Sequence, residues 1–289
     1  MIWLHNLQNN NPGANHTMSR TPTHARPNLK DFLYLHTNSL PYFRGLLRAV
    51  ESRFYLDIDL PAPTLDVGCG DGHFASLTFD RPLDVGLDPW HDPIHEARQY
   101  NAYNLLVEAD GGTMPYADGH FASAVSNSVL EHIPHLDVVL AETARVLQPG
   151  ALFVFCVPSH NFLPNLSVAR FFDAIGLKPL ASAYRAFFNK ISRHHNCDDP
   201  ATWQARLEKA GFKIEKYWHY FSPSALSVLE WGHYFGLPSL ISKKLFGRWI
   251  LVPARWNLAP LLAFLRRYYD EPVPQAKGSY TFYITRRVK

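Results

Sequence analysis

Short apolar runs alternate with helix-periodic segments between residues 61 and 160. Such an alternation predicts repeated βαβ units, and these build a parallel sheet covered by helices. The predicted strands cover residues 64–67, 83–87, 104–108, 121–126 and 152–157. The last of these runs is almost wholly apolar, so we expect it to be buried on both faces of the sheet.

Proline, glycine and aspartate mark the ends of the helices between these strands. Asp92 is predicted to cap a helix whose first residue is Pro93, a position where the missing N–H costs little. Apolar residues recur at helical spacing over 138–147, and we expect Pro149-Gly150 to stop that helix.

The pattern continues to the end of the chain. Asp199 followed by a proline predicts another helix start, and Gly211 is its predicted end. A strand is expected at 213–220, a long aromatic-rich helical stretch at 222–269, and a closing strand at 279–286.

The chain divides into a tail, a helical lead-in and one elaborated α/β domain. Residues 1–28 are polar and rich in Pro and Asn, which predicts a disordered tail, and residues 29–60 form the lead-in. The domain covers 61–289 and carries helical insertions at about 161–196 and 222–272.

Composition narrows the class of protein. Hydrophobic residues make up 47% of the 289 residues, which is enough for a large core. The formal net charge is +3 without a dense basic stripe, so we predict no nucleic-acid partner. Three scattered cysteines argue against a disulfide framework. Because the N-terminal segment lacks a secretory signal pattern, we expect a cytoplasmic protein.

The sequence LDVGCGDG at 65–72 is the strongest functional signal. Gly68, Gly70 and Gly72 follow a predicted buried strand, and glycine permits positive φ and close approach of a ligand. The spacing is GxGxG, whereas the dinucleotide-binding pattern GxGxxG would need a glycine in place of His73. We therefore expect a ligand without a pyrophosphate, and a tight strand–helix turn with no ligand is the alternative.

Two aspartates follow the next two predicted strands. Asp88 lies about twenty residues beyond the glycine loop, where a carboxylate can accept hydrogen bonds from both ribose hydroxyls. Asp110 follows the third strand, where it can accept from an adenine amino group. Because open α/β sheets bind ligands at the carboxyl ends of their strands, these residues predict one nucleoside site.

Four segments, in order along the chain, resemble the sequence blocks of class I S-adenosylmethionine (SAM)-dependent methyltransferases. They are LDVGCGDG, GLDP, EADGGTMPYADGHFASAVSNSVLEHI and ARVLQPGALFVF, within residues 64–158. The chain looks most like the group that includes the ubiquinone/menaquinone-type and other small-molecule enzymes. The resemblance implies a doubly wound, Rossmann-like α/β fold with a seven-stranded, mostly parallel sheet, an antiparallel last strand and a helical insertion. It also implies that SAM is the cofactor.

The resemblance further implies cofactor-binding residues at the carboxyl ends of the first four strands. They are Asp66, Gly68, Gly70, Asp88, Asp110, Gly111, Ser126 and Asn127. Residues of the first strand would line the methionine and ribose, the second strand's acid would hold the ribose hydroxyls, the third would meet the adenine, and the fourth would border the sulfonium. One departure is Phe121-Ala122, where the family usually has Phe-Asp.

Methyl transfer from a sulfonium is an in-line displacement that chiefly needs alignment and exclusion of water. A base is required only when the acceptor must lose a proton. His132, in SVLEHI after the fourth strand, is the predicted catalytic residue, as a base or as a group that orients the acceptor. The alternative for His132 is packing beneath the cofactor, and His160 is a weaker candidate.

The run HHNCDD at 194–199 has the composition of a metal cluster. Adjacent residues rarely converge on one ion, however, and structural zinc uses separated pairs of ligands. We therefore predict no metal site, and interpret the run as a loop that ends in a helix cap at Asp199.

Residues 222–272 carry many aromatic side chains with interleaved Lys and Arg. No apolar run approaches the roughly 18 residues that a bilayer crossing needs. The segment is expected to be a helical lid that helps to form the acceptor pocket, and the alternative is peripheral contact with a membrane interface. Both interpretations suggest a fairly apolar acceptor.

The sequence thus predicts a SAM-dependent methyltransferase acting on a small, fairly apolar molecule. The alternatives are a SAM-binding module without catalysis and a membrane-interface lipid or quinone methyltransferase. The glycine spacing argues against a nicotinamide oxidoreductase. No pattern in the sequence indicates an oligomeric state.

Overall fold

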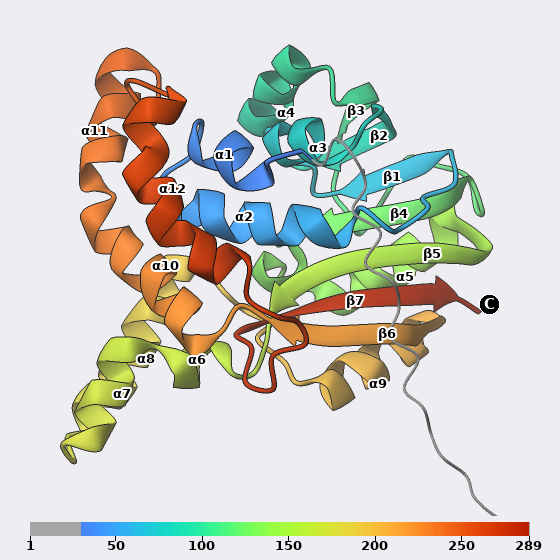
Figure 1. Ribbon diagram of the computed structural model, residues 1–289. Coiled ribbons are helices and arrows are strands. Elements are labelled where there is room, and N and C mark those ends of the chain that lie inside the picture. Colours follow the sequence, from blue (N-terminus) through green and yellow to red (C-terminus); the bar gives the residue numbers. More distant parts are fainter. Residues whose placement is uncertain (1–29, 289) are drawn as a thin grey trace, which may run out of the picture. The chain divides into compact units, whose positions relative to one another are not determined.

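The computed structural model describes residues 30–288, so the predicted tail at 1–28 lies outside the described residues. Strands in this part of the chain form one seven-stranded sheet in the order β3-β2-β1-β4-β5-β7-β6 (Figure 1). Neighbours from β3 to β5 are parallel, and β7 is antiparallel to both β5 and β6. The predicted doubly wound sheet with an antiparallel last strand is confirmed.

The strands are β1 (Thr64–Val67), β2 (Leu83–Asp88), β3 (Tyr103–Glu108), β4 (Phe121–Asn127), β5 (Leu147–Pro158), β6 (Phe212–Tyr220) and β7 (Tyr280–Arg287).

Predicted strand boundaries agree with the structure to within one residue except at the start of β5. That strand begins at Leu147, which pairs with Phe121 of β4. Pro149 and Gly150 were expected to stop a helix, and instead they lie inside β5, where the register with β4 shifts. Gly150 has a φ of 82°, so the Pro-Gly pair forms an irregularity within the strand and does not end a helix.

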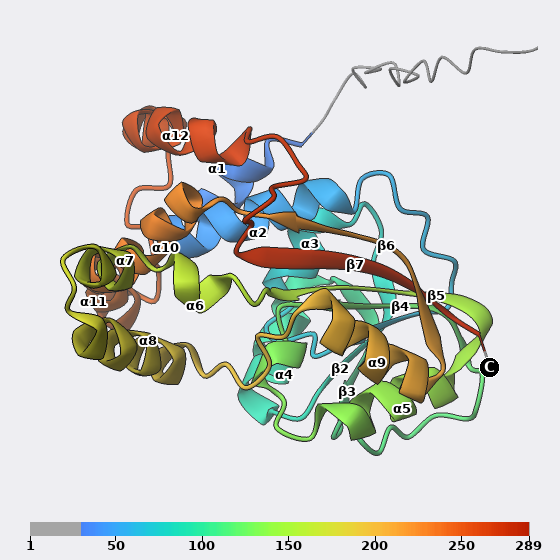
Figure 2. The same cartoon turned by 90° about the horizontal axis from the view of Figure 1, so that it is seen from below.

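Side chains that alternate along β5 enter two separate cores. Val154 and Cys156 pack on the face covered by α2 (Tyr42–Phe54) and α3 (His73–Thr78). Phe153 and Phe155 pack on the face covered by α5 (Leu136–Val146) and α9 (Pro200–Ala210). Figure 2 shows α2 on one side of the sheet and α5 and α9 on the other. This two-sided burial explains why the run lacks polar positions.

Two helix starts show where local signals succeed and where they fail. Asp199 caps α9, because its carboxylate accepts from two backbone N–H groups of the first turn at 2.8 and 2.9 Å. The predicted cap at Asp92 is wrong, since α4 (His91–Ala97) has Trp90 at its N-cap and Asp92 within its first turn. The Trp90 N–H is bound at 3.0 Å by Asp88, a contact from the preceding strand end that the helix pattern does not reveal.

Two helical insertions gather beside the lead-in helices, at one end of the sheet (Figure 1). The lead-in consists of α1 (Phe32–Thr37) and α2, and short 3-10 turns occur at η1 (Arg98–Tyr100) and η2 (Leu130–His132). The first insertion contains α6 (Phe162–Asn165), α7 (Ser167–Ala174) and α8 (Lys178–Ser192). The second contains α10 (Pro223–Phe235), α11 (Leu237–Phe246) and α12 (Arg255–Tyr269). Within residues 30–288, no helix has the length and apolarity that crossing a bilayer requires.

The second insertion packs closely on the lead-in. Helices α10 and α12 both contact α2. A Cβ atom added at Gly232 of α10 would lie 2.3 Å from the Cβ of Phe43 in α2, so this crossing requires glycine. The inserted helices are therefore fixed against the element that lies beside the strand ends.

Candidate active site

The glycine loop after β1 turns back over the end of β2. The backbone N–H groups of Gly68 and Cys69 both donate to the carbonyl of Leu87, at 2.8 and 3.0 Å. A Cβ at Gly68, whose φ is 78°, would lie 2.3 Å from Val129, whereas a Cβ at Gly70 would meet nothing within 4 Å. Gly68 is thus needed for packing, and Gly70 presents open backbone to a cavity.

Asp88 joins the first two strand ends. Its Oδ2 accepts from the N–H of Gly70 and its Oδ1 accepts from the N–H of Trp90, each at 3.0 Å. Burial raises the pKa of Asp88, and these two backbone hydrogen bonds oppose the rise. The carboxylate therefore has a fixed orientation at the base of the glycine loop.

A cavity of about 910 Å³ opens above these residues, a size suited to a nucleoside ligand. Of the predicted cofactor-binding residues, six line it: Gly68, Gly70, Asp88, Asp110, Gly111 and Asn127. The sequence missed Asp71, Phe74 and Trp90, which also line this first cavity. Asp71 lies within the loop and Phe74 just after it, and only their position beside the glycines could have indicated them.

Asp66 and Ser126 are not among the residues that line the first cavity. The hydroxyl of Tyr103 donates to Asp66 at 2.6 Å, and burial raises the pKa of Asp66 to about 7. The buried hydroxyl of Ser126 donates to the carbonyl of Val67 at 2.8 Å. Both side chains support strand β1 beneath the loop, and their contact with a cofactor stays a prediction.

The lead-in closes over the first cavity. Leu40, Arg44 and Arg48 line it, and the hydroxyl of Ser39 lies 2.7 Å from Nε2 of His73, another lining residue. This helical pair places two guanidinium groups opposite the strand ends, a feature that the sequence pattern alone did not indicate.

A second cavity of about 550 Å³ lies between α2 and the inserted helices. Its lining includes Leu229 and His233 of α10, Leu240 of α11, and Trp249. The two cavities share four wall residues, which are Arg44, Arg48, Ser128 and His132. A molecule in the second cavity therefore lies next to one in the first.

His132 lies in this shared wall. Its Nδ1 is 3.0 Å from the carbonyl of Arg193, and its Nε2 is 3.8 Å from Oε1 of Glu131. Burial lowers the pKa of His132, so the imidazole is neutral near pH 7. The weaker candidate His160 lines neither cavity.

A buried carboxylate on α2 holds part of the shared wall together. Glu51 accepts from Arg48 at 2.8 Å, from Asn127 at 2.7 Å, from Ser128 at 3.1 Å and from Tyr220 at 2.9 Å. The sequence shows only an Arg and a Glu three positions apart on a helix, which is ordinarily a surface pair. Tertiary packing turns this pair into the support of the wall.

The fold and the first cavity together define an α/β domain with an open cavity at the carboxyl ends of its parallel strands. Residues 65–155 match a family model described as "Methyltransferase domain". Among solved structures, one titled as a possible histamine N-methyltransferase from Thermotoga maritima covers 89% of this chain and 93% of its own, with a TM-score of 0.50 and 15% identity. At that identity the similarity shows the fold alone.

Two curated relatives overlap the same region. The chain is similar to a fatty-acid O-methyltransferase from Mycolicibacterium smegmatis, 40% identical over 97 residues, which is 32% of this chain and 35% of that protein. It is also similar to a malonyl-[acyl-carrier protein] O-methyltransferase from Enterobacter lignolyticus, 32% identical over 124 residues, which is 43% and 49% of the two chains. The chain thus spans between a third and a half of the length of these relatives.

These similarities confirm the predicted family. Residues 65–155 of the chain carry a methyltransferase domain, and SAM is the cofactor expected of a domain of this kind.

Proposed function

We propose that this protein transfers the methyl group of SAM, bound in the first cavity, to a small and largely apolar acceptor in the second. The observation that carries the proposal is the wall of Arg44, Arg48, Ser128 and His132 that the two cavities share. In-line displacement requires the acceptor atom to face the donor methyl, and adjoining cavities hold the two reactants in that relation.

In this proposal the loop and strand ends bind the cofactor. Asp88 accepts from the ribose hydroxyls, since each carboxylate oxygen keeps a further lone pair beside its backbone hydrogen bond. Gly70 lets the ligand approach the backbone, Asp110 and Gly111 meet the adenine, and Asn127 borders the sulfonium. These roles follow the family resemblance, and the lining of the first cavity supports them.

His132 orients the acceptor where the cavities meet. As a neutral imidazole it can hydrogen-bond to an acceptor heteroatom, or take its proton when the acceptor is a weak acid. The second cavity argues against the alternative of a SAM-binding module without catalysis, because such a module needs no space on the far side of the methyl group.

A carboxylic acid with an apolar chain is the acceptor class that we favour. Both curated relatives described above are named for carboxylic-acid acceptors. Arg44 lies in the shared wall, where burial lowers its pKa, as does the neighbouring Arg48. Within residues 30–288, Arg44 has no hydrogen-bonded acidic partner. A guanidinium on the cavity wall without an acidic hydrogen-bond partner suits a carboxylate.

Two measurements test the proposal. Calorimetry should show that the protein binds SAM and not NAD⁺, and binding of NAD⁺ alone would overturn the cofactor assignment. With methyl-labelled SAM, fatty acids should be methylated in preference to fatty alcohols of equal length.

An arginine variant tests the carboxylate acceptor. Arg44→Met should raise KM for the acid by roughly 10- to 100-fold, because one charge-assisted hydrogen bond is lost. Arg170→Met, at an exposed arginine of α7, is the matched control. Equal KM values for both variants would remove Arg44 from the acceptor site.

The exposed apolar residues of the second insertion support a second candidate, a methyltransferase that works at a membrane interface. The largest exposed fractions belong to Trp256 at 76%, Leu245 at 69%, Phe235 at 66% and Phe246 at 63%. Exposed Lys244 and Arg248 lie near them in sequence. Apolar side chains with basic neighbours are typical of helices that rest on anionic lipid, and vesicle flotation tests this candidate.

A further inference from the structure

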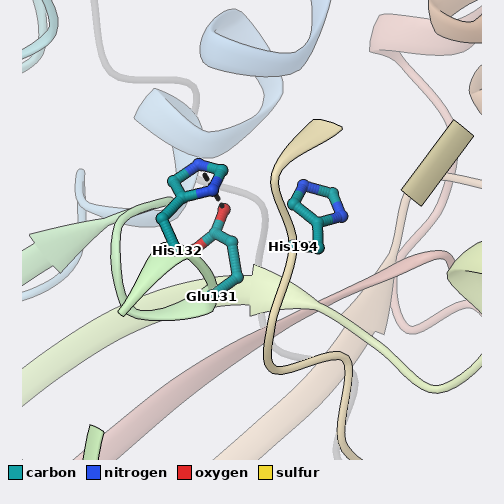
Figure 3. A group of neighbouring side chains, drawn as sticks. All are labelled: Glu131, His132 and His194. Carbon is teal, nitrogen blue, oxygen red and sulfur yellow. Dashed lines mark ion pairs between the residues drawn. The ribbon is translucent and has the colours of Figure 1, made fainter. Parts of the chain in front are cut away.

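Three side chains from two separate segments meet in the wall of the second cavity (Figure 3). Glu131 and His132 belong to η2, and His194 comes from the segment that follows α8. One carboxylate oxygen and one nitrogen of each imidazole lie within 4.8 Å of one another. The HHNCDD run therefore does not act as a unit. Its last residue caps α9, while its first turns toward residues some sixty positions earlier in the chain.

Backbone hydrogen bonds fix the two segments together. The N–H groups of His195 and Asn196 donate to the carbonyl of Glu131, at 2.7 and 3.2 Å. The side-chain amide of Asn196 donates to the carbonyls of Leu130 and Ile133, at 3.1 and 2.8 Å. His194 is thereby held beside His132, with 5.4 Å between ring centroids.

The two imidazoles are arranged as metal ligands usually are. The carbonyl of Arg193 accepts from Nδ1 of His132, which leaves the lone pair on Nε2, the atom 3.8 Å from Glu131. Such a carbonyl partner on the second ring nitrogen is the common support of a ligating histidine. His194 likewise places one ring nitrogen within the cluster.

Glu131 shows that the cluster has unused binding capacity. Its side chain is 2% exposed, and Oε2 has no hydrogen-bond partner in the described part of the chain. The guanidinium of Arg48 is itself paired with Glu51 at 2.8 Å, so it does not satisfy Glu131. A buried carboxylate oxygen without a partner is costly and points to a missing cation.

We propose that Glu131, His132 and His194 bind a divalent transition-metal ion, with Zn²⁺ as the probe. Two nitrogen donors and one carboxylate match the ligand set of catalytic zinc, which keeps a further position open. Mg²⁺ and Ca²⁺ prefer oxygen donors, so they suit this set less well. Zinc–ligand distances of about 2.0–2.1 Å require the donors to draw together by roughly 1 to 1.5 Å.

All three ligands line the second cavity, so the open position faces the acceptor. An acceptor oxygen bound there would be held beside the methyl group, a role that rests on the proposed function. Zinc binding and proton acceptance both use the same Nε2 lone pair of His132. With the metal bound, His132 therefore acts as a metal ligand and not as a base.

The test uses the full chain, freed of metal with a chelator and then titrated with Zn²⁺ by calorimetry. One equivalent should bind, and Glu131→Gln and His194→Ala should each weaken binding by at least about 100-fold. His195→Ala is the matched control, because its side chain is exposed on the same segment and outside the cluster. Equal affinity in wild type and His194→Ala, or equal losses in His194→Ala and His195→Ala, would overturn the proposal.

Co²⁺ gives a readout that needs no variant. The wild-type chain should show the visible absorption of a four- or five-coordinate Co²⁺ site with nitrogen and oxygen ligands, and Zn²⁺ should displace it. A hexa-aqua spectrum, or displacement by Mg²⁺ at equal concentration, would contradict the site.

SAM binding is measured in parallel, since His194 does not line the first cavity. If the wild-type chain binds the metal but not SAM, the proposed function is refuted. If it binds SAM but not the metal, the metal site is refuted.

Discussion

Asp66 and Asp88 are two buried carboxyl groups on adjacent strands whose surroundings differ. Asp88 accepts two backbone N–H groups, which favour its charged form. Asp66 accepts one phenolic hydrogen bond from Tyr103 and lies deeper, so burial raises its pKa to about 7. Asp88 is therefore suited to contact a ligand as a charged carboxylate. Asp66 is suited to support the strand.

Removing the charge of Asp88 tests the ribose assignment. Asp88→Asn replaces one acceptor oxygen with a donor NH₂ group that faces a backbone N–H. We expect SAM affinity to fall roughly 10- to 100-fold, or about 1.5–3 kcal/mol, in calorimetry. Asp84→Asn on the same strand is the control, because Asp84 does not line the first cavity. Unchanged affinity in Asp88→Asn would refute the assignment.

Asp66 predicts a pH dependence of stability. The unfolded carboxyl releases its proton near pH 4, whereas the folded one retains it up to about pH 7. Between these values the unfolded state gains charge that the folded state does not, so wild type loses stability as pH rises. Asp66→Asn lacks this loss. The free energy of unfolding of the variant minus that of wild type should therefore increase by a few kcal/mol between about pH 5 and 7.5. Urea unfolding at both pH values measures the change, and a constant difference would contradict the prediction.

At the scale of elements, α2 connects the parts of the site. It lies on one face of the sheet, contacts α10 and α12, and supplies Arg44, Arg48 and Glu51 to the wall between the cavities or to the network beneath it. Through Glu51, this helix is tied to the end of β4 at Asn127 and to the end of β6 at Tyr220. The second cavity, the proposed acceptor side, therefore depends on a helix that precedes the matched methyltransferase domain in sequence.

Glu51→Ala should destabilise the protein by about 3–5 kcal/mol in urea unfolding, because it removes a buried carboxylate that accepts from four donors and leaves the half-buried Arg48 unpaired. Glu51→Gln keeps an acceptor for some of the four donors and should cost less. A loss below about 1 kcal/mol for the alanine variant would show that the network contributes little to stability.

At the scale of the whole described unit, the sheet and its strand-end cavity form one half of the site and the inserted helices form the other. The insertions lie together at one end of the sheet (Figure 1). The buried Leu229 lines the second cavity, while Leu245 and Phe246 are exposed. The same helices thus supply both a wall of the second cavity and exposed apolar side chains.

Vesicle flotation checks whether that outer surface meets lipid. The wild-type chain should float with phosphatidylcholine vesicles that contain phosphatidylserine, and less with phosphatidylcholine alone. Replacing Phe235, Leu245, Phe246 and Trp256 by Ser should abolish flotation. The control replaces Phe171 and Phe187 of the first insertion, which are 59% and 48% exposed, by Ser and should leave flotation intact. A wild-type chain that stays at the bottom of the gradient with both lipids would refute membrane contact.

The success of the sequence predictions depended on how local each signal was. Strand positions followed from apolar runs, and the cap at Asp199 followed from the proline that comes directly after it. The cap at Asp92 failed because the helix already begins at His91, after Trp90, whose N–H is held by Asp88 at the end of the preceding strand. Pro149 and Gly150 failed as a stop because strand pairing with β4 began before them.

The sequence by itself determined the sheet, its two-sided burial and the glycine turn, because each rests on neighbouring residues and on the allowed φ of glycine. Only the tertiary structure decided that Arg44 and Arg48 face the strand ends, that Glu51 is buried beneath them, and that His194 meets Glu131. These contacts join segments far apart in the chain. Their formation depends on how helices pack across the sheet edge, and no local periodicity encodes that arrangement.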